Sequence, residues 1–207
     1  IKVVDVRARA MEKACPAGTG AMSAILMLDR AEVERVCQEA STEGVCVVAN
    51  FNCPGQVVIS GLASAVKKAG ELAVAKGARK VTPLEVSGPF HSPLMQSARD
   101  ELAAALTMVK FSDARVPVYC NIDAMPTTSA AELKNKLLLQ ITGSVRYEDT
   151  VSNMIRHGVD EFVEIGPGKV LSGLNKKIVA SIQTLFASDS ESLSALLQTT
   201  PAGELKA

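Results

Sequence analysis

The region between residues 21 and 86 restricts the fold more than any other part of the sequence, because apolar strands and amphipathic helices follow one another in it with short turns between them. Four segments have the apolar composition of strands, and two have helical periodicity. We expect strands at Ala21–Leu28, Val45–Phe51, Gln56–Ser60 and Lys80–Val86, one helix from the cap Asp29 to about Thr42, and another over 62–76 that Gly77 ends. This β-α-β-β-α-β order is that of a ferredoxin-like sandwich.

The rest of the chain also mixes helices with strands and predicts the α/β class. An amphipathic helix is expected over residues 1–14, before Pro16. Further strands are expected at Arg115–Tyr119, at Asp160–Ile165 as a buried strand, and at Ile182–Phe186, with helices at 129–140, 148–156 and 169–180. Beyond Ser188 we expect a short leucine-containing helix and then disorder.

Charge and cysteine content exclude several classes of function. The 22 basic and 22 acidic residues cancel, and basic residues are dispersed, so no nucleic-acid surface is expected. The apolar runs are too short to span a bilayer. The five cysteines include no Cys-x-x-Cys pair and are expected to be reduced thiols. With two histidines and no clustered carboxylates, the sequence favours no metal site. Separately, we expect the protein to be a monomer.

The stretch Val86-Ser-Gly-Pro-Phe-His-Ser-Pro-Leu-Met95 joins the end of a strand to the start of a helix. Ser92 is a favourable N-cap and Pro93 suits the first helical position. Apolar residues then recur at helical spacing, namely Leu94, Met95, Ala98, Leu102 and Leu106. His91 therefore lies at a rigid junction, where an imidazole can serve as a general base. The alternative is a histidine in an ordinary loop, and position alone does not decide between the two.

Arg7 interrupts the apolar face of the first predicted helix, between Val3 and Met11. A buried guanidinium is costly unless it meets an anion, so one interpretation is a cation that binds a ligand. The other is an arginine that extends to the surface or pairs with a structural carboxylate. Arg9 falls on the polar face of the same helix and is the weaker candidate.

Four blocks of the sequence carry a resemblance to a known family. They are Pro16-Ala-Gly-Thr-Gly-Ala-Met22, Asn50-Phe-Asn-Cys-Pro-Gly-Gln-Val-Val-Ile59, the histidine stretch 86–95, and Glu164-Ile-Gly-Pro-Gly-Lys-Val-Leu-Ser-Gly-Leu174. In this order and spacing they resemble malonyl-CoA:acyl carrier protein transacylases. The nucleophilic serine of that family lies in a Gly-x-Ser-x-Gly elbow, which this sequence does not contain. Because the resemblance begins downstream of the elbow, we expect the C-terminal two-thirds of a transacylase, inactive by itself.

The resemblance implies an architecture. It predicts part of an α/β-hydrolase-like acyltransferase domain into which a ferredoxin-like subdomain is inserted. Residues 17–86 would form the small subdomain, residues 1–16 and 87–190 the incomplete large subdomain, and residues 191–207 a C-terminal tail.

The resemblance also implies roles for single residues. His91 would be the catalytic base, and Arg7 would bind the free carboxylate of the malonyl group through paired hydrogen bonds. A backbone carbonyl in the segment 144–147, assigned to Arg146, would orient His91, although many relatives have glutamine where this chain has Arg146. Phe90 would fill the space that the α-methyl group of methylmalonyl needs.

The reaction implied is transfer of malonyl from malonyl-CoA to the phosphopantetheine thiol of acyl carrier protein, in fatty acid biosynthesis and without a cofactor. Its location would be the cytoplasm of a bacterium, or a plastid or mitochondrion of a eukaryote. Two alternatives stay open. One is an acyltransferase domain of a polyketide synthase or multifunctional fatty acid synthase, and the other is a non-catalytic module that binds a ligand or carrier protein.

Overall fold

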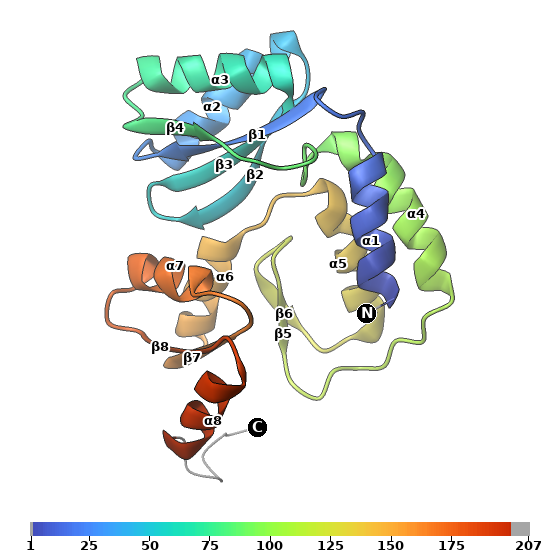
Figure 1. Ribbon diagram of the computed structural model, residues 1–207, viewed down its shortest axis with the longest axis vertical. Helices are drawn as coiled ribbons and strands as arrows, with labels where there is room; N and C mark the ends of the chain where they lie inside the picture. The colour runs from blue at the N-terminus through green and yellow to red at the C-terminus, as the bar shows by residue number, and fades with distance from the viewer. Residues whose placement is uncertain (1, 200–207) are drawn as a thin grey trace. The chain divides into compact units, whose positions relative to one another are not determined.

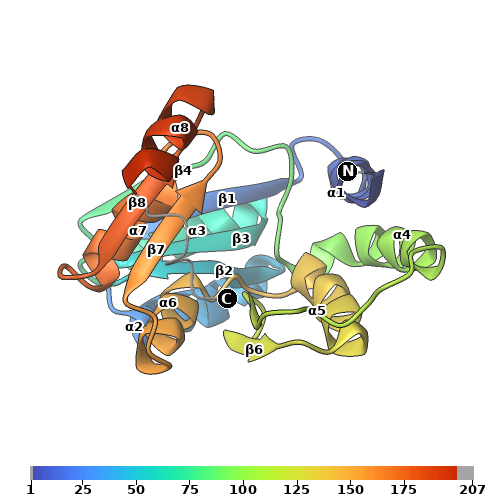
Figure 2. The same ribbon diagram turned by 90° about the horizontal axis from the view of Figure 1, so that it is seen from below.

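The computed structural model describes residues 2–199, in which helices and strands are mixed along the chain (Figures 1 and 2). The elements are α1 (Lys2–Lys13), β1 (Gly20–Leu26), α2 (Arg30–Ala40), η1 (Ser41–Glu43), β2 (Cys46–Cys53), β3 (Gln56–Leu62), α3 (Ala63–Ala75), β4 (Lys80–Pro83), η2 (Pro93–Met95), α4 (Gln96–Thr107), β5 (Val118–Cys120), β6 (Met125–Thr127), α5 (Ala130–Thr142), α6 (Tyr147–Arg156), β7 (Glu161–Ile165), α7 (Val170–Ile178), β8 (Gln183–Ala187) and α8 (Ser190–Thr199). The α/β class is therefore as predicted.

A four-stranded antiparallel sheet has the strand order β2-β3-β1-β4, with α2 and α3 over one face (Figure 1). The sequence explains its boundaries. Asp29 caps α2 by accepting a hydrogen bond from the backbone N–H of Ala31 at 2.9 Å. Gly55, at φ +73°, turns β2 into β3. A Cβ at Gly61 would lie 1.9 Å from the Val45 carbonyl oxygen, so only glycine allows this approach of the two strands.

The predicted β-α-β-β-α-β order is observed, with each boundary within three residues of its expected place. One hydrophobic core lies between the sheet and the two helices. It includes Ile25, Val33, Val36, Val48, Phe51, Val57, Ile59, Val66 and several alanines. The opposite face of the sheet carries a smaller buried group of Met22, Ala24, Ala49 and Val58, against which Phe90 packs.

Helices α1, α4 and α5 form a second cluster, in which α4 contacts both others (Figure 2). The apolar stripe predicted after His91 faces this core, with Met95, Ala98, Leu102 and Leu106 buried and Leu94 half-buried. Ala10 and Met11 of α1 and Ile141 of α5 complete it. Burial of this stripe is what fixes the start of α4, and with it the turn that carries His91.

The segment after α5 joins the helical cluster to the sheet. Val145 pairs with Asn50 as an isolated parallel bridge on the edge strand β2. Its N–H donates to the Ala49 carbonyl at 2.7 Å, and its carbonyl accepts from the Phe51 N–H at 2.8 Å. The Ser144 hydroxyl donates to the Val48 carbonyl at 2.6 Å. The C-terminal end of α5 is thereby held against the sheet.

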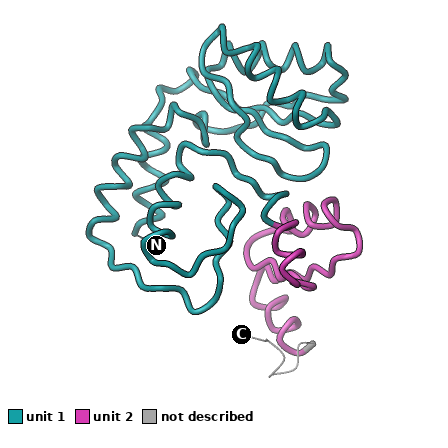
Figure 3. Tube along the Cα trace, turned by 180° about the vertical axis from the view of Figure 1, so that it is seen from behind, with its two compact units in different colours: residues 1–150 teal, residues 151–207 magenta. Residues whose placement is uncertain are grey.

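The chain divides into two compact units, residues 1–150 and 151–207 (Figure 3). The sequence did not predict this boundary. The predicted subdomain limits, at residues 16/17 and 86/87, lie inside unit 1 and stay a prediction. These limits separate the hydrophobic core between the sheet and its two helices from the hydrophobic core formed by α1, α4 and α5.

In unit 2, β7 and β8 form a two-stranded parallel sheet. The expectation of a buried strand over 160–165 is wrong, because residues of β7 alternate between exposed and half-buried and Ile165 is 74% exposed. The Glu164 carboxylate accepts hydrogen bonds from Leu171 N, Ser172 N and Ser172 Oγ at the start of α7. The expected leucine-containing helix is α8, and residues 200–207 of the predicted tail lie outside the described residues.

Candidate active site

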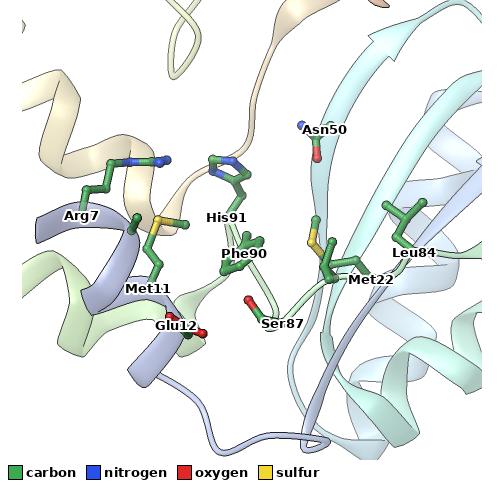
Figure 4. A pocket seen from close by; sticks show the side chains of 11 residues that line it. Arg7, Met11, Glu12, Met22, Asn50, Leu84, Ser87, Phe90 and His91 are labelled. Atoms are coloured by element: carbon green, nitrogen blue, oxygen red, sulfur yellow. The ribbon is translucent and has the colours of Figure 1, made fainter. Parts of the chain in front are cut away.

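A cavity of about 570 Å³ in unit 1 contains His91 and Arg7 together (Figure 4). It is bounded by α1, by β1 and β2 of the sheet, and by the segment that follows β4. The lining residues are Arg7, Ala8, Met11, Glu12, Met22, Asn50, Leu84, Val86, Ser87, Phe90 and His91. The structure thus brings the two predicted site residues into one cavity, although 84 positions separate them in the chain.

His91 lies in a tight turn with left-handed backbone geometry, at φ +58°. The Phe90 N–H donates to the Gly88 carbonyl at 3.0 Å, and the buried Ser92 hydroxyl donates to the Pro89 carbonyl at 2.6 Å. Ser92 occupies the N-cap position, but its side chain makes no cap hydrogen bond. The prediction that Ser92 caps the helix is therefore wrong. The Ser92 hydroxyl closes the histidine turn instead. A strained, well-supported conformation of this kind is common where a side chain must be aimed into a site.

The ring of His91 is oriented by Gln140. The Nδ1 atom lies 2.9 Å from the Gln140 carbonyl oxygen. Because a carbonyl only accepts, Nδ1 carries the proton in the neutral ring, and Nε2 keeps the lone pair that a base needs. Gln140 lies in the last turn of α5, where backbone carbonyls have no N–H partner within the helix.

The assignment of this role to Arg146 is therefore wrong. The Arg146 carbonyl accepts from Thr150 N at 2.9 Å and from Thr150 Oγ1 at 2.8 Å, as expected within the first turn of α6. Its side chain donates to Asp149 at 2.8 Å. Arg146 lines a different cavity of about 580 Å³ that also includes Arg30 and Phe51.

Burial lowers the pKa of His91, the hydrogen bond to Gln140 raises it, and the positive charge of Arg7 lowers it. The net effect is a pKa below the ordinary value of histidine. The imidazole is therefore neutral at neutral pH and able to accept a proton. The charged side chains that line the cavity with it are Arg7 and Glu12, both on α1.

Arg7 is a half-buried cation whose side chain extends toward the His91 ring (Figure 4). Burial lowers its pKa, but a guanidinium stays charged in proteins. Within residues 2–199 no carboxylate forms an ion pair with it. Arg9, in contrast, is exposed and pairs with Asp5 at 2.9 Å. The preference for Arg7 over Arg9 as the ligand-binding arginine thus agrees with their surroundings.

The remaining wall is apolar around Met11, Met22, Leu84 and Phe90, with the Asn50 amide across the cavity from Arg7 (Figure 4). Such a site suits a small acyl group with one anionic end, because the guanidinium supplies the only unpaired positive charge on a mostly apolar lining.

Among the described helices, none is both long and apolar enough to cross a membrane.

The family of acyl transferase domains matches residues 1–196, and the chain belongs to this family. The malonyl CoA-acyl carrier protein transacylase of Bacillus subtilis is 46% identical over 200 residues, which are 96% of this chain and 63% of that protein. The Escherichia coli K12 protein of the same name is 39% identical over 198 residues, covering 96% of this chain and 64% of that protein.

Solved structures agree with the sequence comparison. An acyl carrier protein S-malonyltransferase from Vibrio cholerae is 41% identical, with a TM-score of 0.91 over 94% of this chain and 64% of that chain. A malonyl-transacylase in complex with a type II PKS acyl-carrier protein is 39% identical, with a TM-score of 0.92 over 96% of this chain and 64% of that chain. The chain thus spans somewhat less than two-thirds of the length of these relatives.

Proposed function

We propose that this chain supplies the base and the carboxylate-binding arginine of a transferase that moves malonyl from malonyl-CoA to the phosphopantetheine thiol of acyl carrier protein. One observation carries the proposal. A neutral histidine and an unpaired arginine line the same small, mostly apolar cavity. The names of the relatives support this substrate pair.

The proposed reaction proceeds in two half-reactions. A serine hydroxyl, in an elbow that this sequence does not contain, loses its proton to Nε2 of His91 and attacks the thioester carbonyl. The C–S bond breaks, and the imidazolium returns the proton to the departing thiol of coenzyme A. The thiol of the carrier protein then attacks the serine ester in the reverse sense. Backbone amides would stabilise the oxyanion, and the Gln140 carbonyl would hold the imidazolium.

The cavity also supports a choice of acyl group. The Arg7 guanidinium would bind the malonyl carboxylate with two parallel hydrogen bonds. Phe90, which packs against the sheet, would occupy the volume that an α-methyl group requires. We therefore propose malonyl as the preferred substrate, with discrimination against methylmalonyl limited to roughly the 10–200-fold that one methyl group allows.

We propose that residues 17–86 form a ferredoxin-like subdomain inserted into an α/β-hydrolase-like domain. The strand order β2-β3-β1-β4 with two helices on one face supports the first part. The type II PKS partner in one related structure keeps a polyketide role open beside fatty acid synthesis. A bacterial cytoplasm, or a plastid or mitochondrion of a eukaryote, stays a prediction for the location.

The proposal is tested by joining this chain to the part of the Bacillus subtilis relative that the comparison does not cover, where the family resemblance places the serine elbow. The joined protein should transfer labelled malonyl from malonyl-CoA to acyl carrier protein. His91→Ala should abolish most of this activity, whereas His157→Gln, which changes the other histidine, should not. Full transfer by the His91→Ala variant would overturn the role of His91 as the base, whereas no transfer by the joined protein would favour a non-catalytic module that binds a ligand or carrier protein.

A further inference from the structure

A continuous set of hydrogen bonds connects the His91 ring to the edge of the sheet. Nδ1 of His91 bonds to the Gln140 carbonyl at 2.9 Å. The Gln140 amide donates to the carbonyls of Gly143, at 2.9 Å, and Ser144, at 3.2 Å. The Ser144 hydroxyl in turn donates to the Val48 carbonyl of β2 at 2.6 Å. Ser144 is thus bonded on one side to the residue that orients the histidine and on the other to the sheet.

Ser144 is also the first residue at which the chain leaving α5 meets the sheet. The helix ends at Thr142, and Gly143 is extended. A Cβ at Gly143 would lie 2.2 Å from the Ile122 side chain and 3.0 Å from the Leu139 carbonyl oxygen, so the chain passes through a narrow space here. The backbone bonds of Val145 to β2 hold the chain one residue further on. The hydroxyl of Ser144 therefore makes the first side-chain contact with the sheet after the C-terminal end of α5.

We propose that Ser144 is a positioning residue that, through its bond to β2, fixes the Gln140 carbonyl and so sets the tautomer and basicity of His91. This inference rests on the proposed function, because it concerns the base of that reaction. Without the hydroxyl, the last turn of α5 can move relative to β2, and the bond from Nδ1 to the carbonyl weakens. The neutral ring then distributes its proton between both nitrogens, and the imidazolium loses part of its stabilisation.

Few other groups affect the pKa of His91. The bonds to the backbone of α5 and its C-terminal turn raise the pKa, whereas burial and Arg7 of α1 lower it. Glu12 of α1 is the other charged group that lines the cavity. The residues facing it from the sheet, Met22 and Asn50, are uncharged. A change in the tautomer of His91 upon mutation at Ser144, with α1 untouched, therefore reports on the Gln140 carbonyl.

The test is nitrogen NMR of the 207-residue chain labelled only at its two histidines, in which His157 serves as the internal reference. In the wild type, His91 should carry its neutral-state proton on Nδ1. In Ser144→Ala we expect the ratio of the Nδ1–H to the Nε2–H tautomer to fall about fivefold. This is the change in an equilibrium constant that corresponds to the free energy of one ordinary hydrogen bond. The pKa of His91 should fall further, because a contact that raises it is loosened. Ser144→Thr, which retains the hydroxyl, should resemble the wild type.

A matched control separates this role from general stability. Ser41→Ala removes a similar bond, from the Ser41 hydroxyl to the Cys37 carbonyl at 2.8 Å, at the end of α2. It should lower the melting temperature without moving the His91 signals. If Ser144→Ala does not fold, Ser144→Thr and Ser144→Val give the same comparison with side chains of equal shape.

The inference is overturned if the tautomer ratio and titration of His91 are unchanged in the variant that lacks the hydroxyl. Because this measurement needs neither substrate nor nucleophile, its failure is distinguishable from failure of the malonyl-transfer assay.

Discussion

Replacement of Arg7 by alanine should change acyl selectivity more than any other single substitution in the cavity. Malonyl has a carboxylate for the guanidinium to bind, whereas acetyl has none. Two charge-assisted hydrogen bonds are worth about 1.5–3 kcal/mol each. Part of this is offset because a half-buried arginine without an ion pair loses some hydration when a ligand covers it. We therefore expect a net loss of about 3 kcal/mol for malonyl transfer, or about 100-fold in kcat/KM.

The assay compares kcat/KM for malonyl-CoA and acetyl-CoA in the protein joined to its serine elbow, with folding checked by thermal melting. The malonyl-to-acetyl ratio should fall by about two orders of magnitude in Arg7→Ala, and Arg7→Lys should restore only part of it, because an ammonium cannot donate two coplanar bonds. Arg9→Ala is the matched control, since that arginine is exposed and pairs with Asp5. A ratio that changes in the Arg9 variant and not in the Arg7 variant would refute the reasoning.

The same substitution has a second readout in the pH profile. The positive charge of Arg7 lowers the pKa of His91, so its removal should raise that pKa. Because the base must be neutral, the acidic limb of kcat/KM for acetyl-CoA should move to higher pH in Arg7→Ala. A limb that stays in place would mean that Arg7 and His91 do not interact electrostatically.

Further measurements test other parts of the structure. His91→Ala should lower kcat by about two to four orders of magnitude, and a loss below about tenfold would contradict a role as general base. Ser60→Ala should raise the free energy of unfolding in urea by about 1 kcal/mol, since the fully buried Ser60 hydroxyl has no hydrogen-bond partner among the described residues. Burial raises the pKa of Asp149, but the bonds from Arg30 and Arg146 outweigh it and lower the pKa overall. Its ionised form therefore stabilises the fold at neutral pH, and wild type should lose more stability than Asp149→Asn as the pH falls below about 4, which melting curves would show. Finally, the chain without an added elbow should show no malonyl adduct by intact mass after incubation with malonyl-CoA.

The sequence predicted the small sheet and its helices well because local signals determine them. Alternating or continuous apolar residues identified the strands, and Asp29 and Gly77 identified the ends of α2 and α3. Interruption of an apolar helix face was enough to single out Arg7 before its surroundings were known. In each case the signal comes from residues that lie close together in the sequence, within one or two helical turns of one another.

Interactions between distant segments could not be predicted in the same way. The bond from His91 to Gln140 spans 49 positions, and a backbone acceptor leaves no signature in the side chain. The signal that could have identified it is the position of Gln140 two residues before the end of a helix, where carbonyls are unpaired. Strand β6 was missed because it has three residues, one of them Pro126, which argues against a strand.

The left-handed backbone conformation of His91 carries a cost in fold stability at the residue that is proposed to act as the base. For an L-amino acid other than asparagine or aspartate, adopting φ near +58° costs about 1–2 kcal/mol. Glycine, which has no Cβ, is free of that penalty, and asparagine tolerates the geometry well. Either residue would remove this conformational cost, but it would also remove the imidazole and its hydrogen bond to the Gln140 carbonyl, which offsets part of the gain in stability. The histidine turn is maintained by the buried Ser92 hydroxyl and by the helix α4 that packs beneath it, so mutations that improve this support offer a route to greater stability that leaves the imidazole in place.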